Sequence, residues 1–304
     1  MPMKDILKIS IVNFKSQWGN KEKNTQRIVE YIECAASEGS NMIVFPEMCL
    51  TGMADEAEKP FHEKMQYRNA EKMDGTAVQL ISKAAQNAGI YALIGMPYMD
   101  TDDSDKLYNA AGIFYPEGNV DIYKKIHIAQ ASELSWATKG NQPKMLDTPW
   151  GKIGIAICYD VYFFPELIRY YVAKGARMVI NLTAYSKRYG LKQAIYPMAT
   201  YVFTNQIYIA AANLCGLEKD GEYYYGGSCV IGPSNKPFDI CYYAGIPFGE
   251  EGADEQQMFT TTIDLSLAER GLFQNNPIYD SPDFRADLYA KLYKEVAEEL
   301  GCKS

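Results

Sequence analysis

Apolar positions repeat with a helical period in two stretches of the first hundred residues. The first stripe covers residues 28–36, after cap candidates at positions 24 and 25, and the second covers residues 77–85. A glycine follows each stripe where such a helix would end, and a short apolar run comes next: "MIVF" after the first and "IYALIG" after the second. We therefore expect two amphipathic helices, each leading into a buried strand.

The same alternation continues through the middle of the chain, with a hairpin inserted. "AAGIFYPEGNVDIYKKIHI" reads as two strands joined at a turn over residues 116–119. Later, "KIGIAI" leads through a helix from about 165 to 174 into "RMVINLTA", and a helix near 192–205 leads into "IYIAAAN". Alternating helices and strands favour an α/β layered sheet.

The alternation ends near residue 265. Residues 266–304 read as an extended arm followed by one amphipathic helix, which would pack on its own domain or on a neighbouring subunit. We therefore expect one domain over residues 1–265 and an arm over 266–304.

Composition and charge narrow the class of protein. The chain has 304 residues, 47% of them hydrophobic and 22% charged, which suits a soluble globular protein with a sizeable core. It has no signal-peptide pattern and no apolar run long enough to span a membrane, so a cytoplasmic location is expected. A net charge of −8 argues against nucleic acid and anionic membranes as partners. The expected partner is a small molecule.

The cysteines suggest neither a disulfide framework nor a zinc site. There are seven, widely spaced, with no CxxC pair. Cys34, Cys215 and Cys229 fit the usual role of cysteine as a small buried hydrophobe. Cys158 differs because it falls at the end of the strand "KIGIAI", just before the helix that begins at Pro165. A nucleophile on such a strand-to-helix turn is held out of the sheet, where loops bind ligands.

A thiol at Cys158 needs a group to accept its proton, because little thiolate is present at neutral pH. His62 lies in a charged stretch that indicates a solvated side chain. Lys125 and His127 share one face of the predicted strand "YKKIHI", which indicates either an exposed polar face or a cation held in a cleft with a supporting residue beside it. Glu47, in "IVFPEMCLTG", follows a strand as Cys158 does and is the carboxylate candidate.

Three motifs in this order, "VFPEMCLTG", "YKKIHI" and "IGIAICYD", resemble the Glu, Lys and Cys motifs of the nitrilase superfamily, the carbon–nitrogen hydrolases. The likeness continues through "NLTAY" and "GGSCVIGP" to the tail "PIYDSPDFRADLY" and so covers nearly the whole chain. The resemblance implies a four-layer α-β-β-α sandwich. It also implies a homodimer or a larger homo-oligomer.

The resemblance assigns roles to particular residues. Cys158 matches the nucleophile, Glu47 the general base and Lys125 the cation beside the developing oxyanion. Glu133 matches a second carboxylate that many members carry seven residues before a glycine. The backbone N–H of Tyr159 would be a further oxyanion donor, and the site needs no cofactor and no metal.

This chain departs from the family pattern in the turn after the nucleophile, where Phe-Pro-Glu lies one residue farther away than usual. Tyr162 and Phe163 in that turn, with Thr183 and Tyr185 at the end of the strand "MVINLTA", predict a substrate pocket walled by aromatic rings. Such a pocket suits a neutral or amine-bearing substrate. The alternative is that Lys187 or Arg188 reaches in to bind a carboxylate.

The expected reaction is hydrolysis of a small linear amide or N-carbamoyl amine through a thioester on cysteine, with release of ammonia or an amine. Tyr-Asp after the cysteine is commoner in amidases and carbamoylases than in nitrile-hydrolysing members. Nitrile hydrolysis by the same Glu, Lys and Cys remains an alternative. The other two alternatives are a papain-like Cys–His enzyme and a non-catalytic binding protein on this fold.

Overall fold

The computed structural model describes residues 3–100, 103, 105–129, 131–237 and 239–302. The chain divides into two compact units, Met1–Glu269 and Arg270–Ser304, and each is described by itself.

Within the described part of the first unit, the strands form two six-stranded mixed sheets and one small hairpin. The first sheet has the order β14 (Gln257–Asp264), β1 (Ile6–Asn13), β2 (Met42–Val44), β3 (Tyr91–Met99), β4 (Leu107–Phe114) and β5 (Val120–Lys124). The second has the order β13 (Ile240–Gly245), β12 (Cys229–Pro233), β9 (Tyr208–Asn213), β8 (Ala176–Thr183), β7 (Gly151–Ile157) and β6 (Lys144–Thr148). The hairpin pairs β10 (Cys215–Leu217) with β11 (Tyr223–Tyr225).

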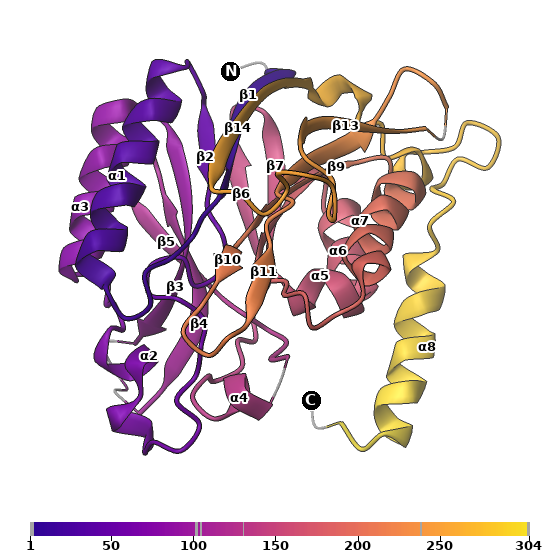
Figure 1. Cartoon of the computed structure of the whole chain (residues 1–304). Helices are drawn as coiled ribbons and strands as arrows, with labels where there is room; N and C mark the ends of the chain where they lie inside the picture. The colour runs from indigo at the N-terminus through magenta and orange to yellow at the C-terminus, as the bar shows by residue number, and fades with distance from the viewer. Residues whose placement is uncertain (1–2, 101–102, 104, 130, 238, 303–304) are drawn as a thin grey trace. The chain divides into compact units, whose positions relative to one another are not determined.

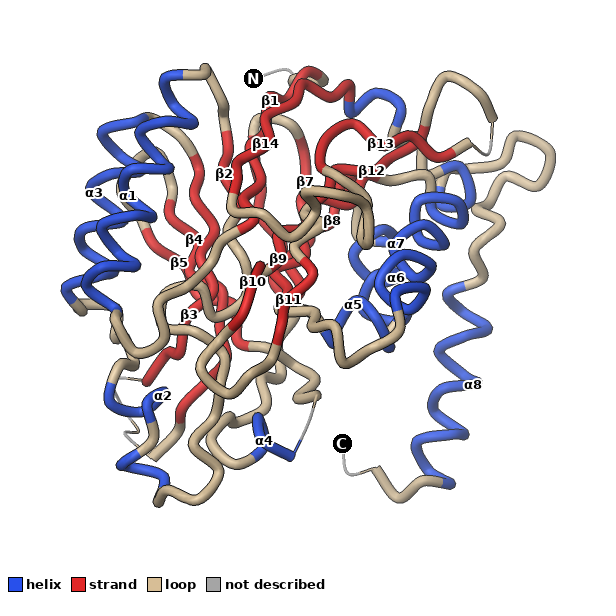
Figure 2. Tube along the Cα trace, in the orientation of Figure 1, coloured by secondary structure: helices blue, strands red, loops and turns tan. Residues whose placement is uncertain are grey.

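The two sheets pack face to face, and helices cover their outer faces (Figures 1 and 2). Ile9 and Leu93 of the first sheet share one buried cluster with Ile155 and Ile180 of the second. The first sheet is covered by α1 (Lys21–Ser37) and α3 (Thr76–Ala88), and the second by α5 (Tyr159–Phe163), α6 (Pro165–Ala173) and α7 (Leu191–Asn205). The expected four-layer α-β-β-α sandwich is confirmed.

Short elements in the connections complete this unit. They are α2 (Met65–Arg68), α4 (Ala131–Leu134) and the 3₁₀ turns Phe61–Glu63 and Leu265–Leu267. Among the described residues, no helix combines the length and the apolar character that crossing a bilayer requires.

Several sequence-based boundaries are wrong in detail. Helix α1 begins a turn earlier than expected, because the side chain of Asn20 accepts a hydrogen bond from Lys23 N and caps it, while Asn24 lies inside the helix. Leu80 lies within the stripe expected over residues 77–85, which forms part of α3, but it is exposed. The short helix α5 was not expected, and it lies between Cys158 and Phe-Pro-Glu.

The second unit contains a 3₁₀ turn, Gly271–Phe273, and the helix α8 (Ala286–Glu299). The apolar residues Leu288, Leu292 and Val296 recur every four positions and are exposed. This helix therefore presents an apolar stripe along its length.

Candidate active site

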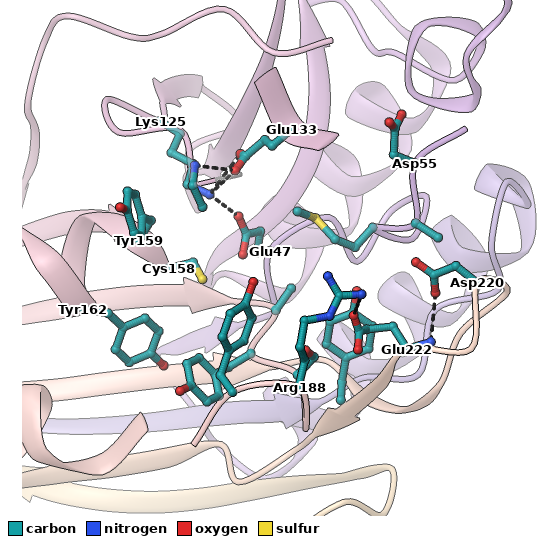
Figure 3. A pocket seen from close by; sticks show the side chains of 18 of the residues that line it. Glu47, Asp55, Lys125, Glu133, Cys158, Tyr159, Tyr162, Arg188, Asp220 and Glu222 are labelled. Atoms are coloured by element: carbon teal, nitrogen blue, oxygen red, sulfur yellow. Dashed lines mark hydrogen bonds and ion pairs between the residues drawn. The ribbon is translucent and has the colours of Figure 1, made fainter. Parts of the chain in front are cut away.

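A cavity of about 440 Å³ brings together the residues that follow three strands. Glu47 comes after β2, Lys125 after β5 and Cys158 after β7, so both sheets contribute to its floor (Figure 3). These three residues lie far apart in the sequence, and Glu133 of α4 joins them. The structure thus brings together all four residues that the sequence predicted as catalytic.

Cys158 sits on a sharp turn between β7 and α5. Its φ of 48° and ψ of −97° are unusual for a residue with a side chain. Its backbone N–H donates to Leu182 O and to Asn181 Oδ1, both at 2.9 Å, which fixes the turn against β8. The thiol projects into the cavity on the side of Glu47 (Figure 3). Such backbone geometry is typical of a residue that the fold holds out for chemistry.

Lys125 lies between two buried carboxylates. Its Nζ donates to Glu47 Oε1 at 2.7 Å and to the two oxygens of Glu133 at 2.9 and 3.0 Å. All three side chains are about 1% exposed. The two carboxylates hold the ammonium group in one place beside the thiol (Figure 3).

Asn109, on β4, is a fourth member of this cluster that sequence reasoning missed. Its Nδ2 donates to Glu47 Oε1 and to Glu133 Oε1, both at 2.7 Å, and the residue is fully buried. Its backbone O also accepts from Lys125 N at 2.9 Å. A polar residue in the middle of the apolar strand "LYNAAGIF" was the available signal, because a buried amide needs partners. Glu47 Oε2, by contrast, is buried without a hydrogen-bond partner and faces the cavity.

The electrostatics of the cluster suit a base beside a neutral thiol. Burial raises the pKa of Glu47; Lys125 lowers it in part, and the charge of Glu133 raises it further. Burial and the charge of Glu47 raise the pKa of the Cys158 thiol, while Lys125 and a hydrogen bond with Thr183 lower it. Burial lowers the pKa of Lys125, but Glu133 and Glu47 raise it more, so the net pKa lies above the ordinary value. The ammonium group therefore stays charged.

Most of the aromatic residues expected to line the cavity do so. Tyr159, Tyr162, Phe163 and Tyr185 all line the cavity, and the Tyr162 and Tyr185 rings lie 5.1 Å apart. Thr183 is different, because it is fully buried and is not a lining residue. It contacts the Tyr162 hydroxyl at 3.4 Å.

The prediction that His127 shares a strand face with Lys125 is wrong, because β5 ends at Lys124. His127 does not line the cavity; its ring stacks on Phe164 with ring centroids 3.5 Å apart, and its Nδ1 contacts Asp160. Asp160, in the turn after Cys158, is fully buried and does not line the cavity. His62 stays outside the cavity lining.

The outer end of the cavity carries charges that the sequence pattern had not brought together. Asp55, Arg188, Asp220 and Glu222 line it (Figure 3), and Arg188 forms an ion pair with Glu222. Lys187, the other candidate cation, pairs with Asp254 at 2.8 Å and is not a lining residue. The side chain of Arg188 is 60% exposed, so it stands at the mouth of the cavity.

The remaining thiols play no part in the cavity. Cys215 and Cys229 are buried as expected, but Cys34 is exposed, because its position on α1 lies off the buried stripe. Among the described residues, no group of three or more His, Cys, Asp or Glu side chains is arranged to hold a metal ion.

A model of the carbon-nitrogen hydrolase family matches residues 8–270. The chain belongs to this family. The match spans both sheets and every strand end that contributes to the cavity.

A relative and two solved structures are similar to this chain over most of its length. The chain is 28% identical to the omega-amidase NIT2 of Homo sapiens over 280 residues, which cover 89% of this chain and 92% of the relative. The crystal structure of Nit3 from Saccharomyces cerevisiae, of the nitrilase superfamily, has a TM-score of 0.75 at 24% identity and covers 88% of this chain and 94% of its own. An amidase from Nesterenkonia sp. has a TM-score of 0.74 at 21% identity, covering 94% of this chain and 96% of its own. These two structures share the fold of this chain.

Proposed function

We propose that this carbon–nitrogen hydrolase is a cysteine-dependent amidase that hydrolyses small linear amides or N-carbamoyl amines. The observation that carries the proposal is the buried cluster of Glu47, Lys125 and Glu133 beside a thiol on a strained turn. The likeness to omega-amidases over most of the chain supports amides rather than nitriles as substrates.

In the first half of the reaction, Glu47 accepts the thiol proton of Cys158 while the sulfur attacks the carbonyl carbon. The unpartnered oxygen of Glu47 faces the cavity and is free to take that proton. The tetrahedral intermediate then collapses, the carbon–nitrogen bond breaks, and the proton passes from Glu47 to the departing ammonia or amine. A thioester on Cys158 remains.

The negative charge on the attacked oxygen is balanced by Lys125 and by the backbone N–H of Tyr159. The ammonium group of Lys125 is already oriented by two carboxylates, so it pays little reorganisation cost during the reaction. The N–H of Tyr159 is the first in α5, where the helix itself supplies no acceptor. In the second half, Glu47 takes a proton from water as the water attacks the thioester. The carbon–sulfur bond then breaks, Glu47 returns the proton to the sulfur, and the acid product and the free thiol are released.

We propose that the far end of the substrate is neutral or carries an amine. Tyr162, Tyr185 and Tyr189 give the cavity an aromatic wall, which packs against alkyl and aromatic groups and attracts ammonium groups. The charge of Arg188 is offset by Glu222, so a carboxylate would have to compete for it. Asp220 adds a negative charge nearby.

The test is ammonia release from a panel of linear amides, N-carbamoyl amines and nitriles of matched chain length. The proposal expects turnover of amides or N-carbamoyl amines, with an acyl adduct on the Cys158 peptide in quenched reactions analysed by mass spectrometry. Turnover of nitriles with no turnover of amides would support the nitrile alternative. No adduct and no turnover with any class would support a non-catalytic protein.

We also propose that residues 1–265 carry the chemistry, that residues 266–304 form an arm, and that the protein is a homodimer or a larger homo-oligomer. The exposed apolar stripe of α8, formed by Leu288, Leu292 and Val296, supports a partner surface, because such a stripe is costly to leave in water. Light scattering on the full chain should give a multiple of the monomer mass. Lysine at all three positions should lower that mass, whereas Glu295→Lys on the same helix should not. A monomeric full chain would contradict the proposal.

The proposed compartment is the cytoplasm. The seven cysteines carry free thiols in this structure, which suits a reducing environment. Cell fractionation with thiol labelling of the native protein tests this, and recovery of the protein from an oxidising compartment would contradict it.

A further inference from the structure

Asp160 is a fully buried carboxylate that the mechanism above does not use. It lies two residues after Cys158, on α5, and does not line the cavity. Four donors nevertheless converge on it. Its Oδ1 accepts from His127 N at 3.0 Å and from His127 Nδ1 at 2.8 Å, and its Oδ2 accepts from Tyr123 Oη at 2.7 Å and from Ile157 N at 3.1 Å. We assign a proton to His127 Nδ1 because a carboxylate oxygen only accepts.

The donors to Asp160 belong to residues within two positions of Lys125 or Cys158 in the chain. Tyr123 lies two residues before Lys125 and His127 two residues after it, so both sides of Lys125 are tied to Asp160. The remaining donor, Ile157, is the residue before Cys158. One carboxylate therefore joins the backbone that carries the ammonium group to the turn that carries the thiol.

This link crosses between the two sheets. Strand β5, which leads to Lys125, is the edge of the first sheet, and β7, which leads to Cys158, belongs to the second. The backbone N–H of Lys125 donates to Asn109 O at 2.9 Å, and its backbone O accepts from Gly140 N at 2.7 Å. Those bonds hold Lys125 to its own sheet and loop but do not set its distance from the thiol. The His127 ring, stacked on Phe164 at 3.5 Å, adds a second contact between the same segments.

We propose that Asp160 is a positioning residue that fixes the ammonium group of Lys125 relative to the thiol of Cys158. It contacts neither the substrate nor the reacting atoms. A displacement of about 1 Å in such a site can lower the rate of the chemical step about 100-fold. The effect is expected on the chemical step rather than on substrate binding, because none of the four donors to Asp160 belongs to a residue that lines the cavity.

Two variants test the proposal. Asp160→Asn keeps the shape of the side chain, but whichever way the amide turns, its NH₂ group faces two donors, and at least one backbone N–H loses its acceptor. Tyr123→Phe removes one hydroxyl that donates to Asp160 and leaves the ring in the core. Tyr115→Phe is the matched control, because its hydroxyl donates to Asp121 at 2.9 Å, outside the cavity lining.

Two readouts are compared, and the kinetic one rests on the proposed amidase function. Asp160→Asn should lower kcat about 100-fold and Tyr123→Phe about tenfold, each with KM within threefold of the wild type, whereas Tyr115→Phe should change kcat by less than twofold. The second readout needs no turnover: alkylation of Cys158 by iodoacetamide, followed peptide by peptide with Cys34 as the internal reference. Both Asp160→Asn and Tyr123→Phe should slow it at least fivefold, because Lys125 lowers the pKa of the thiol.

The outcomes separate the two proposals. If the wild type turns over no amide but the variants still slow alkylation of Cys158, the function is wrong and the positioning role stands. If Tyr123→Phe and Tyr115→Phe change kcat and alkylation alike, Asp160 has only a structural role and the inference is overturned. Should Asp160→Asn fail to fold, Tyr123→Phe decides by the same criteria.

Discussion

Replacing Glu133 by glutamine tests whether the second carboxylate belongs to the catalytic unit. The change keeps the size of the side chain and removes its charge. In the wild type, the Glu133 carboxylate accepts from Lys125 Nζ at 2.9 and 3.0 Å, from Asn109 Nδ2 at 2.7 Å and from Ala129 N at 3.0 Å. A glutamine must turn its NH₂ group toward the ammonium group and a second donor.

The loss of stability follows from these contacts. Removing one member of a buried ion pair costs about 3–5 kcal/mol when the partner is left alone. Lys125 keeps Glu47 at 2.7 Å, so the lower part of that range applies, and we expect a loss of about 3–4 kcal/mol in the free energy of unfolding. This is less than the total stability of most proteins of this kind, about 5–15 kcal/mol, so the variant should still fold.

The loss of activity should be larger than instability alone would give. Without Glu133, the ammonium group of Lys125 is held from one side, so we expect kcat to fall at least about 100-fold. The acid limb of the pH profile should also move to lower pH. Glu47 must be ionised to act as a base, so activity falls as the pH drops through its raised pKa, and the charge of Glu133 is one cause of that rise.

The assay compares urea unfolding and steady-state kinetics for Glu133→Gln and for a control, Glu71→Gln. Glu71 is also a buried carboxylate with a lysine partner, Lys21 at 2.5 Å, and it accepts from the backbone N–H of Ala77 at 3.2 Å. It does not line the cavity. The control should lose stability but keep kcat within about threefold.

A kcat within threefold of the wild type for Glu133→Gln would refute the reasoning, and so would an equal fall in kcat for both variants. An acid limb that stays in place or moves to higher pH would contradict the electrostatic part alone.

Four further results are expected. Cys158→Ala and Cys158→Ser should abolish turnover with nearly unchanged unfolding curves, and Glu47→Gln should be nearly as damaging; activity within tenfold of the wild type would contradict the mechanism. The acid limb of the kcat/KM profile should lie above the ordinary glutamate pKa, because the pKa of Glu47 is raised. Deprotonation of Lys125 should cause no loss of activity at alkaline pH, because its pKa is raised too. Measuring kcat/KM against pH checks both. Neutral or amine-bearing amides should show higher kcat/KM than matched amides that carry a carboxylate. Glu222→Gln should reduce this difference in kcat/KM, because it removes the ion-pair partner of Arg188. A carboxylate series with tenfold higher kcat/KM in the wild type, and with that advantage lost in Arg188→Ala, would overturn the proposed substrate preference. Exhaustive chelation should leave activity intact, since the expected chemistry needs no metal; loss on chelation and return with one metal would show otherwise.

The sequence alone determined the local features of this protein. Apolar periods of two and of 3.6 residues predicted the strands and helices, because each element must bury one face. They also placed Glu47 and Cys158 after strands, and the resemblance of the motifs to the nitrilase superfamily assigned roles to Lys125 and Glu133 beside them. The four-layer sandwich followed from the resemblance of those motifs to a family.

The tertiary structure alone decided which side chains meet. Asn109 contacts Glu47 across 62 positions of the chain, and Asp160 faces His127 rather than the cavity. Such contacts depend on how the two sheets pack and on the direction in which each side chain leaves its strand end. The end of β5 at Lys124 is one example, because a strand that continued through His127 would have put its side chain on the same face as that of Lys125. A local pattern carries no information about distances between segments that only packing brings together.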